Sequence, residues 1–458
     1  MQYPWHALAT WAPFAIDALG LITLLGAEEV NAAVGRLAPS LWLEYMPLLA
    51  GFVFAADRHR AKQATFTLYN VSSGIVTGNL AGWFTRWMQA QEFEAARSVV
   101  YWEVEPTAQT RWKYQLVSTA VSVTCMGLLL VLTVLSGDWY GFTNAVAIVV
   151  LISTRAYLVQ MAREAIDTAV AAARPLPATF SGALNLWQAR AQVDPAAAGA
   201  RPQRDGQKWR PEHAKIIVVM PNSQAVTMFI PEHLLRPIFV TDTTPGSPAL
   251  YRLVRWAGWV AFTVHVVTLG MAMLATQLYI IAIMVASTVL TCYGWGCDDS
   301  RLAKWWRAWR QGEETPAQPY LYRAGLHLTA TVFEWPQDME FARDSMSGAI
   351  SRRYLSKPIP PSQRSKARMD LYAWLNLSVE EEKSLWDWHL LPHPREHDDS
   401  WWRDFREKQA LVRDDPWDIQ AIVRGIRDSS SQTSSTPKSV SSTSTPIARG
   451  EKGDLGVL

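Results

Sequence analysis

The sequence has little net charge and none of the short motifs that mark common enzymes. Its 43 lysine and arginine residues and 41 aspartate and glutamate residues leave a formal net charge of +2. This balance excludes a generally basic protein that binds nucleic acid. Walker A, dinucleotide-binding, nucleophile-elbow and protein-kinase signatures are missing. These absences argue against ATP-driven transport and the common soluble chemistries, and they predict no catalytic residue and no cofactor.

Residues that bind metals or form disulfides are also scarce or badly spaced. The cysteines, Cys125, Cys292 and Cys297, lie in or beside apolar stretches, and their spacings fit neither a disulfide framework nor a zinc site. His393 and His397 have metal-ligand chemistry, but they lie in a proline-containing loop without the i, i+4 presentation of a helix. We therefore expect buried cysteines, a solvated loop and no metal site.

The hydropathy of the chain is bimodal. Its mean hydropathy of -0.02 averages apolar stretches long enough to enter a bilayer with long polar, tryptophan-rich stretches that could not. A membrane span needs about 20 apolar residues, and six stretches approach this length. They are residues 11–27, 41–56, 114–135, 139–154, 256–275 and 278–293.

The predicted fold is mainly α: a polytopic membrane protein with six transmembrane helices in three hairpins, a small cytosolic β-hairpin and a helical cytosolic C-terminal region. The chain then divides into eight segments. They are 1–56 (first transmembrane hairpin), 57–113 (cytosolic or interfacial), 114–155 (second hairpin), 156–250 (cytosolic linker and β-hairpin), 251–297 (third hairpin), 298–312 (amphipathic interfacial helix), 313–427 (helical cytosolic region) and 428–458 (disordered Ser/Thr-rich tail).

Lysine and arginine collect beside one set of span ends. That set includes Arg58, Arg155, Arg163 and Arg255, whereas the opposite set holds only Arg36. The positive-inside rule therefore predicts that both termini and all long loops are cytosolic. Tryptophan gathers at membrane interfaces, and in this orientation Trp42 lies at the outer one.

Strand and helix signals organise the soluble parts. The β-branched runs 215–220 and 225–230 flank a four-residue turn, which predicts a hairpin that must dock on a third strand or on the spans. A charged stretch over 89–104 resembles a helix. Helices are also predicted over 369–374 and 378–388, the second opening with a capping box.

Residues 300–311 form the best amphipathic pattern in the chain. Aromatic and apolar side chains occupy one stripe and cations cover the other side, which favours a helix in the lipid headgroup layer. The alternative is a helix packed on its own cytosolic domain. The interface residues are Leu302, Trp305, Trp306 and Trp309 on the stripe, with Arg301, Lys304, Arg307 and Arg310 opposite.

Three ionisable residues fall inside predicted spans: Asp17, Glu44 and His265. Such groups are expensive in a membrane and are functional candidates. Structural accounts compete with this reading. Asp17 lies within reach of Arg58, the outer headgroups could solvate Glu44, and His265 could hydrogen-bond a neighbouring helix.

Residues 11–20, 54–70, 225–232 and 296–299 carry a resemblance to a known family. Together they are similar to uncharacterised multi-pass integral membrane proteins of filamentous fungi, and the likeness covers most of the chain short of the tail. The resemblance implies a fungal source and an integral membrane protein. Because that family has no established activity, it assigns no functional residue.

The sequence favours a non-enzymatic integral membrane protein that organises partners or lipid at the cytosolic membrane face. Its expected partners are the bilayer and a cytosolic protein, with no nucleic acid. The alternative is a secondary carrier or an ion or proton pathway that uses Asp17, Glu44 or His265. The third hypothesis is a membrane enzyme acting on a lipid or isoprenoid substrate.

Overall fold

The computed structural model is mainly helical, and four of its helices are long and apolar enough to cross a membrane. This is the architecture of an integral membrane protein. The four helices are α6 (Trp112–Ser136), α7 (Trp139–Ala173), α10 (Pro248–Met271) and α11 (Leu274–Cys292). The structure describes residues 25–63, 65–91, 93, 96–105, 112–173, 213–297, 309, 320–324, 327–334, 339–354, 367–393, 400–414, 416 and 418–434.

The predicted second span over 41–56 is wrong. Residues 41–51 form turns, and only the short helix α4 (Phe52–Ala55) follows. The stretch is apolar because it is buried inside the protein, with Ala50 and Val53 fully covered. The predicted first span, 11–27, lies almost wholly outside the described residues, and its end opens the short helix α3 (Ala27–Gly35).

The four apolar helices occur as two consecutive pairs, α6–α7 and α10–α11, each joined by a short turn and called a hairpin here. Their turns meet through one buried side chain, Asp138. One carboxylate oxygen of Asp138 accepts the Gly141 N–H at 2.8 Å, and the other accepts the Met273 N–H at 2.9 Å. Asp138 therefore caps the start of α7 and ties it to the turn between α10 and α11.

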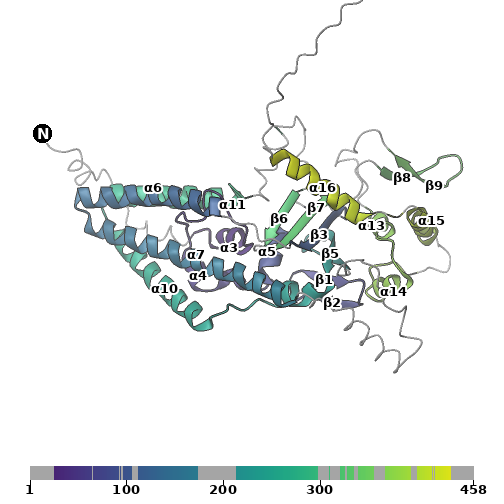
Figure 1. The fold of residues 1–458 in the computed structure, drawn as a ribbon, viewed down its shortest axis with the longest axis horizontal. Coiled ribbons are helices and arrows are strands. Elements are labelled where there is room, and N and C mark those ends of the chain that lie inside the picture. Colours follow the sequence, from purple (N-terminus) through teal and green to yellow (C-terminus); the bar gives the residue numbers. More distant parts are fainter. Residues whose placement is uncertain are drawn as a thin grey trace, which may run out of the picture. The chain divides into compact units, whose positions relative to one another are not determined.

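Helix α7 continues well beyond a membrane span. Its 35 residues correspond to roughly 52 Å, whereas the hydrocarbon core is about 30 Å thick. Its second half, including Leu158 and Ile166, packs into the hydrophobic core of the extramembrane domain. One continuous helix thus joins the bundle to that domain, and the two lie at opposite ends of it (Figure 1).

The extramembrane domain is built on a seven-stranded mixed sheet in the order β2-β1-β4-β5-β3-β7-β6. The predicted hairpin is confirmed as β4 with β5, and it docks between two further strands, β1 and β3. All neighbours are antiparallel except β3 and β5. The strands are β1 (Thr67–Asn70), β2 (Ile75–Thr77), β3 (Ser98–Val104), β4 (His213–Val219), β5 (Ala225–Pro231), β6 (Tyr320–Ala324) and β7 (Leu328–Glu334).

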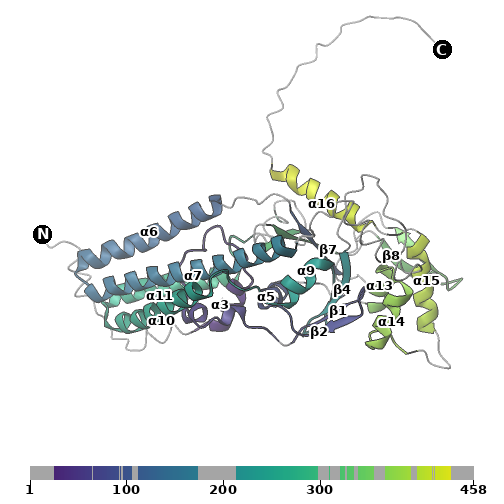
Figure 2. The same cartoon turned by 60° about the horizontal axis from the view of Figure 1, so that its bottom comes forward.

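The sheet gathers three segments that lie far apart in sequence (Figure 2). Hairpin α6–α7 is inserted between β3 and β4, and hairpin α10–α11 is inserted between β5 and β6. Two parallel strands need a long crossover connection between them. Between β3 and β5, the membrane helices α6 and α7 supply most of that connection. The sheet cannot form unless both membrane hairpins return the chain to the same side.

Aromatic side chains fill the core between the sheet and helix α5 (Gly82–Ala90). Trp87 and Trp102 are fully buried and meet edge to face with ring centroids 5.1 Å apart. Phe239, from the short helical segment η2 (Leu235–Val240), packs edge to face on Trp102 at 5.0 Å. Such contacts add to the free energy gained by burying these large rings.

Two stretches that were predicted to be helical contain strands. The stretch 89–104 contains β3, whose β-branched and aromatic residues suit a central strand buried on both faces. The predicted helical region 313–427 contains β6 and β7, then a small separate hairpin of β8 (Met339–Arg343) and β9 (Ile350–Tyr354).

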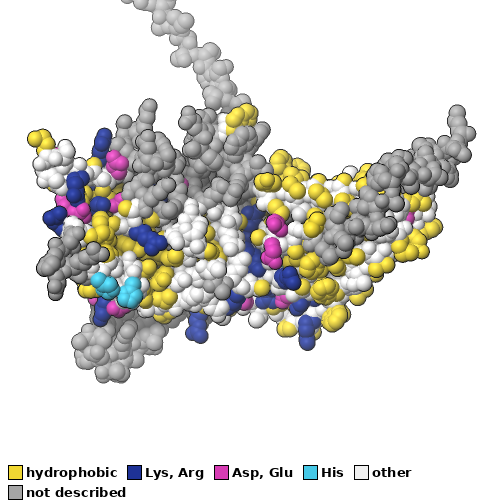
Figure 3. All heavy atoms as spheres, turned by 180° about the vertical axis from the view of Figure 1, so that it is seen from behind, with side chains coloured by type: hydrophobic (Ala, Val, Ile, Leu, Met, Phe, Trp, Pro, Cys, Tyr) yellow, Lys and Arg dark blue, Asp and Glu magenta, His cyan; other side chains and the backbone are white. Residues whose placement is uncertain are grey.

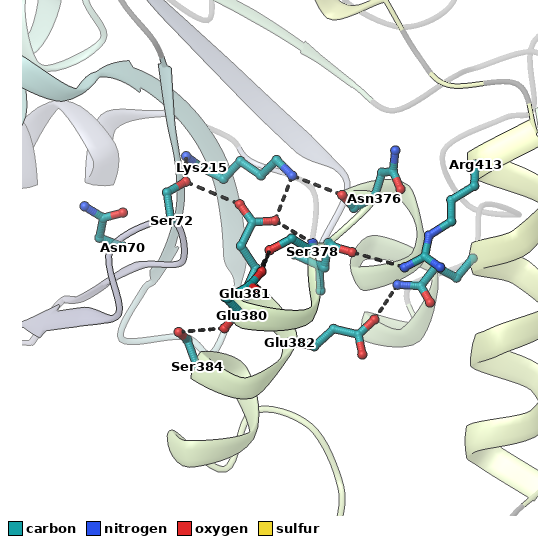
Figure 4. A network of polar contacts seen from close by, with 12 residues as sticks. Asn70, Ser72, Lys215, Asn376, Ser378, Glu380, Glu381, Glu382, Ser384 and Arg413 are labelled. Atoms are coloured by element: carbon teal, nitrogen blue, oxygen red, sulfur yellow. Dashed lines mark hydrogen bonds and ion pairs between the residues drawn. The ribbon is translucent and has the colours of Figure 1, made fainter. Parts of the chain in front are cut away.

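Helices α13 (Arg368–Trp374), α14 (Val379–Asp387) and α15 (Ser400–Asp414) follow. The predicted capping box is confirmed: Ser378 and Glu381 bond reciprocally at the start of α14. Glu381 also accepts a hydrogen bond from Lys215 of β4 at 2.9 Å, and Lys215 reaches the Asn376 carbonyl at 3.0 Å (Figure 4). One carboxylate thus caps a helix and fixes it to the sheet.

Residues 417–458 form a separate compact unit. Its helix α16 (Ile419–Ser434) is amphipathic and extends into the segment that was predicted to be disordered from residue 428. That boundary is therefore wrong by at least seven residues. The remainder of the predicted tail, from residue 435, lies outside the described residues.

The surface of the bundle is apolar and ends in two aromatic belts. Hydrophobic side chains gather over the membrane helices, whereas charged side chains concentrate from the junction with the sheet outward (Figure 3). Trp139 and Tyr140 are exposed at the turn end, and Trp112 and Trp256 at the sheet end. Amphipathic rings at both ends of an apolar band are typical of a membrane-spanning bundle.

Replacing Asp138 by alanine is expected to destabilise the bundle, because the N–H groups of Gly141 and Met273 both lose their acceptor. The expected loss is about 2 kcal/mol in the free energy of unfolding, measured by denaturant titration in mixed micelles. Ser136→Ala is the control, because Ser136 only bonds back to Thr133 within its own helix. Equal losses in the two variants would contradict this role.

Replacing Lys215 by methionine is expected to loosen helix α14, because Glu381 and the Asn376 carbonyl lose a shared cation. We expect a loss of about 1 kcal/mol locally, visible as faster amide hydrogen exchange over residues 376–388 with little change elsewhere in the sheet. Lys383→Met, at an exposed position on the same helix, should leave exchange unchanged. Unaltered exchange in the Lys215 variant would count against the contact.

Candidate functional site

The most unusual part of the structure is the segment 36–61, which is largely irregular backbone packed among the membrane helices. Leu37, Ala50 and Asp57 all have positive φ, at 58°, 53° and 63°. Non-glycine residues rarely adopt this conformation, so the surrounding structure must impose it. Irregular backbone at membrane depth also needs every polar group satisfied by the protein.

Hydroxyl groups of two membrane helices bind the backbone of this segment. Ser118 of α6 accepts the Tyr45 N–H at 3.2 Å, and Ser122 donates to the Tyr45 carbonyl at 2.6 Å. Thr288 of α11 accepts the Leu49 N–H at 2.9 Å. These small polar residues therefore act as backbone ligands, beyond the close packing that four-residue spacing allows.

Four arginines bind the carbonyl groups of the same segment. Arg155 and Arg163 come from α7, Arg255 from α10 and Arg86 from α5. Each guanidinium offers several N–H donors in a rigid fork. The acceptors in the segment are the carbonyls of Glu44 and Met46 for Arg155, Leu37 for Arg163, Ala55 for Arg255, and Arg58 and Ala61 for Arg86.

Arg86 lies at the junction between the segment and the sheet domain, and two glycines make room for the contact. A Cβ on Gly35 would lie 2.4 Å from Cδ of Arg86, and a Cβ on Gly82 would lie 2.5 Å from the Arg60 carbonyl oxygen. Both distances are too short for any side chain. Glycine is therefore required at both positions so that the segment can sit against α5.

Glu44 forms the ion pair of this site. Its Oε1 lies 2.7 Å from Nη1 of Arg163, and its Oε2 accepts the Ser40 N–H at 3.1 Å. Burial raises the pKa of this carboxyl, but the charge and hydrogen bond of Arg163 and the Ser40 N–H outweigh burial and hold it below its ordinary value. Glu44 is therefore ionised at neutral pH.

The structure moves Glu44 and Trp42 away from the outer level where the sequence placed them. Trp42 lies against Gly296, and the Ser40 hydroxyl donates to the Trp295 carbonyl, both just beyond the sheet-side end of α11. Arg36 also belongs to this side, because its carbonyl accepts a hydrogen bond from Tyr322 of β6. The earlier placement assumed a spanning helix over 41–56, which would have carried Glu44 across the membrane.

A cleft opens between the segment, α7 and the end of α11. The cleft is open at its mouth, and the space in it that the centre of a water-sized molecule can reach is about 30 Å³. Its polar lining includes Arg36, Ser40, Glu44, Arg155 and Arg163, and Thr291 and Trp295 complete the α11 side. Three cations therefore face one carboxylate within the cleft.

His265 occupies a different place, in the middle of the α7–α10 contact. Its Nδ1 lies 3.1 Å from Oδ1 of Asn144, while Nδ2 of Asn144 donates to the His265 carbonyl at 2.7 Å and to Thr268 at 3.0 Å. Because an amide oxygen only accepts, Nδ1 of His265 is the donor of this hydrogen bond. His265 thus joins two helices through a hydrogen bond, as the structural account predicted.

The candidate residues do not converge. Glu44 binds Arg163 and His265 binds Asn144, which lie 19 positions apart on α7, or about 28 Å along its axis. Asp17 lies outside the described residues, as do all the proposed interface residues of 300–311 except Trp309, which is 63% exposed. In the described part of the chain, no three His, Cys, Asp or Glu side chains form a group that could hold a metal ion.

Sequence reasoning missed the arginines as a site. From the sequence, Arg155 and Arg163 were interpreted only as charges that flank the spans and set the orientation of the protein in the membrane. Their spacing of eight residues places both on one face of a helix that continues past the span, and this signal was available in the sequence. The partners, which are backbone carbonyls of segment 36–61, left no trace in the sequence.

No protein-family model, curated protein or solved structure matches this chain. The fold and the site must therefore be interpreted from their own geometry. That geometry defines an integral membrane protein in which an arginine-clamped segment joins the bundle to a sheet domain.

His59 gives the junction a measurable pH dependence. The side chain is 1% exposed, neither ring nitrogen has a partner among the described residues, and burial lowers its pKa to about 4. As the pH falls, His59 of the unfolded chain binds a proton near pH 6.5. In the folded chain, His59 stays unprotonated until about pH 4. The free energy of unfolding should therefore fall by about 3 kcal/mol as pH decreases across that window.

The measurement is thermal unfolding in detergent between pH 7.5 and pH 4.5, for the wild type and for His59→Leu. The substitution should flatten the pH dependence, because the group that titrates differently in the two states is gone. His389→Leu, at an exposed position, should retain the slope of the wild type. A wild-type slope in the His59 variant would show that other groups cause the acid sensitivity.

Proposed function

We propose that this protein is a non-catalytic, membrane-anchored organiser that holds a folded binding module at the cytosolic face of a membrane. The observation that carries the proposal is the junction. The sheet domain is joined to the bundle by α7 and by the arginine-clamped segment 36–61, in addition to its covalent linkers. A domain held in this way keeps a constant height and orientation above the lipid.

The cytosolic orientation is supported by the distribution of charge. Arg58, Arg60 and Lys62 lie at the sheet end of the bundle, together with Arg155 and Arg163. The two described turns at the other end, 137–138 and 272–273, contain no lysine or arginine. This asymmetry supports a cytosolic sheet domain under the positive-inside rule.

The polar groups of the bundle give the carrier hypothesis less support. A proton or cation pathway needs exchangeable groups that converge at one depth. In the described chain Glu44 and His265 are separately paired and far apart along α7. The fungal family resemblance remains a prediction and assigns no activity.

The proposal is tested by chemical cross-linking of the full-length protein in its native membrane, followed by mass spectrometry. We expect a cytosolic protein in fixed stoichiometry, cross-linked to residues 65–105, 213–231 or 320–414. A truncation after Glu334 keeps all seven strands of the sheet and shows whether the partner needs the helices that follow.

Proteoliposomes provide the opposing measurement. If the purified protein carries protons or cations, a pH-sensitive dye should report flux above that of empty liposomes, and Glu44→Gln or His265→Asn should abolish it. We expect no such flux from the wild type. Flux that either substitution removes, without loss of folded protein, would replace the organiser by a carrier.

A further inference from the structure

The cleft beside segment 36–61 lies at the depth of lipid headgroups. Counted from the turn ends of their helices, Arg155 lies about 24 Å along α7, Thr291 about 26 Å along α11 and Arg163 about 36 Å along α7. With a hydrocarbon core about 30 Å thick, Arg155 and Thr291 lie inside it, within about 6 Å of its sheet-side edge. Arg163 is in the headgroup layer.

Donors in this cleft remain unused by the protein. Arg155 is 6% exposed, and both of its hydrogen bonds come from Nη2. Arg163 uses Nε and Nη1. Among the described residues, Nε and Nη1 of Arg155 and Nη2 of Arg163 have no acceptor. None of these three nitrogens is sealed from solvent, so an anion that enters the cleft can accept hydrogen bonds from them.

A buried hydroxyl in the same cleft is also unpartnered. Oγ1 of Thr291 is inaccessible to solvent and has no hydrogen-bond partner in the described chain. Thr291 lines the same cleft as Arg155 and Arg163. A ligand bound there could supply the hydrogen-bond partner that this hydroxyl lacks.

The charge of the lining selects an anion. Arg36, Arg155 and Arg163 face a single carboxylate, that of Glu44. The ligand must be compact, must accept several hydrogen bonds and must be present at headgroup depth. A phosphate group meets all three conditions, because its oxygens match the geometry of arginine donors.

We propose that this cleft binds the phosphate of an anionic phospholipid from the leaflet on the sheet side. The phosphate accepts hydrogen bonds from Arg155, Arg163 and Thr291. The acyl chains lie along the exposed apolar face at the end of α11, where Leu290 and Tyr293 are 36% and 63% exposed. Basic pockets between membrane helices on the cytosolic side are known binding places for such headgroups.

This inference rests on the proposed function only in taking the bundle to be embedded in a membrane. If no protein partner is found, the lipid site is unaffected. If no lipid is retained, the proposal that the sheet domain binds a protein partner is unaffected. The two failures are therefore distinguishable.

The test is native mass spectrometry of the full-length protein, released from nonionic detergent that contains equal amounts of phosphatidylcholine and phosphatidic acid. We expect the wild type to retain a single phosphatidic acid molecule in preference to phosphatidylcholine. Arg163→Gln should weaken that retention by roughly tenfold or more. Arg252→Gln is the matched control, because Arg252 is exposed at the same end of α10.

Thr291→Val keeps the test decisive if Arg163→Gln fails to fold. The substitution preserves shape and removes only the unpartnered hydroxyl, so the protein should be at least as stable as the wild type but retain phosphatidic acid several-fold less well. Equal retention in Thr291→Val, Arg252→Gln and the wild type would overturn the proposal. So would the absence of any retained anionic lipid.

Inorganic phosphate separates the two possible sources of the anion. If the site takes lipid, phosphatidic acid should raise the melting temperature of the wild type, whereas millimolar phosphate in the same detergent should not. Equal stabilisation by free phosphate, lost in Thr291→Val, would assign the cleft to a soluble anion and overturn the lipid assignment.

Discussion

The structure depends on the binding of backbone carbonyls by buried arginines. Segment 36–61 runs through the end of a membrane bundle without regular secondary structure, where unsatisfied carbonyl groups would each cost several kcal/mol. Arg155 and Arg163 from one membrane helix, Arg255 from another and Arg86 from the sheet domain bind those carbonyls. Because each guanidinium can bind more than one acceptor, four side chains bind six carbonyls of the segment. The same contacts join the bundle to the domain.

Helix α7 explains why those arginines can serve two environments. Its first half carries apolar side chains toward lipid, and its second half packs Leu158 and Ile166 into the core of the sheet domain. Arg155 and Arg163 occupy the transition between the two halves. A cation there can bind the clamped segment on one side and face headgroups on the other, so a structural clamp and a site for an anion are compatible.

The sheet adds a second constraint, because it is assembled from segments that the membrane hairpins separate. The parallel contact between β3 and β5 closes only after α6 and α7 have crossed and returned. The aromatic core around Trp87 and Trp102 then holds the strands together. Folding of the domain and insertion of the helices are therefore coupled.

Much of this architecture was readable from the sequence because it depends on local patterns. Four uninterrupted apolar stretches identify the membrane helices, β-branched runs around a tight turn identify the β4–β5 hairpin, and Ser378 with Glu381 marks the start of α14. Each signal is carried by residues close together in the chain. The same local reasoning failed at 41–56, since a buried irregular segment is as apolar as a membrane helix.

Tertiary structure alone decided the site. Hydropathy cannot distinguish burial in lipid from burial in protein, so the place of Glu44 depended on whether 41–56 crossed the bilayer. The partner of Glu44 is 119 residues away in sequence. The acceptors of Arg155 are main-chain carbonyls, which every residue possesses and no sequence pattern marks. The sequence by itself determined that ionisable residues such as Glu44 and Arg155 lie in or beside apolar stretches. The fold determined which groups those residues bind.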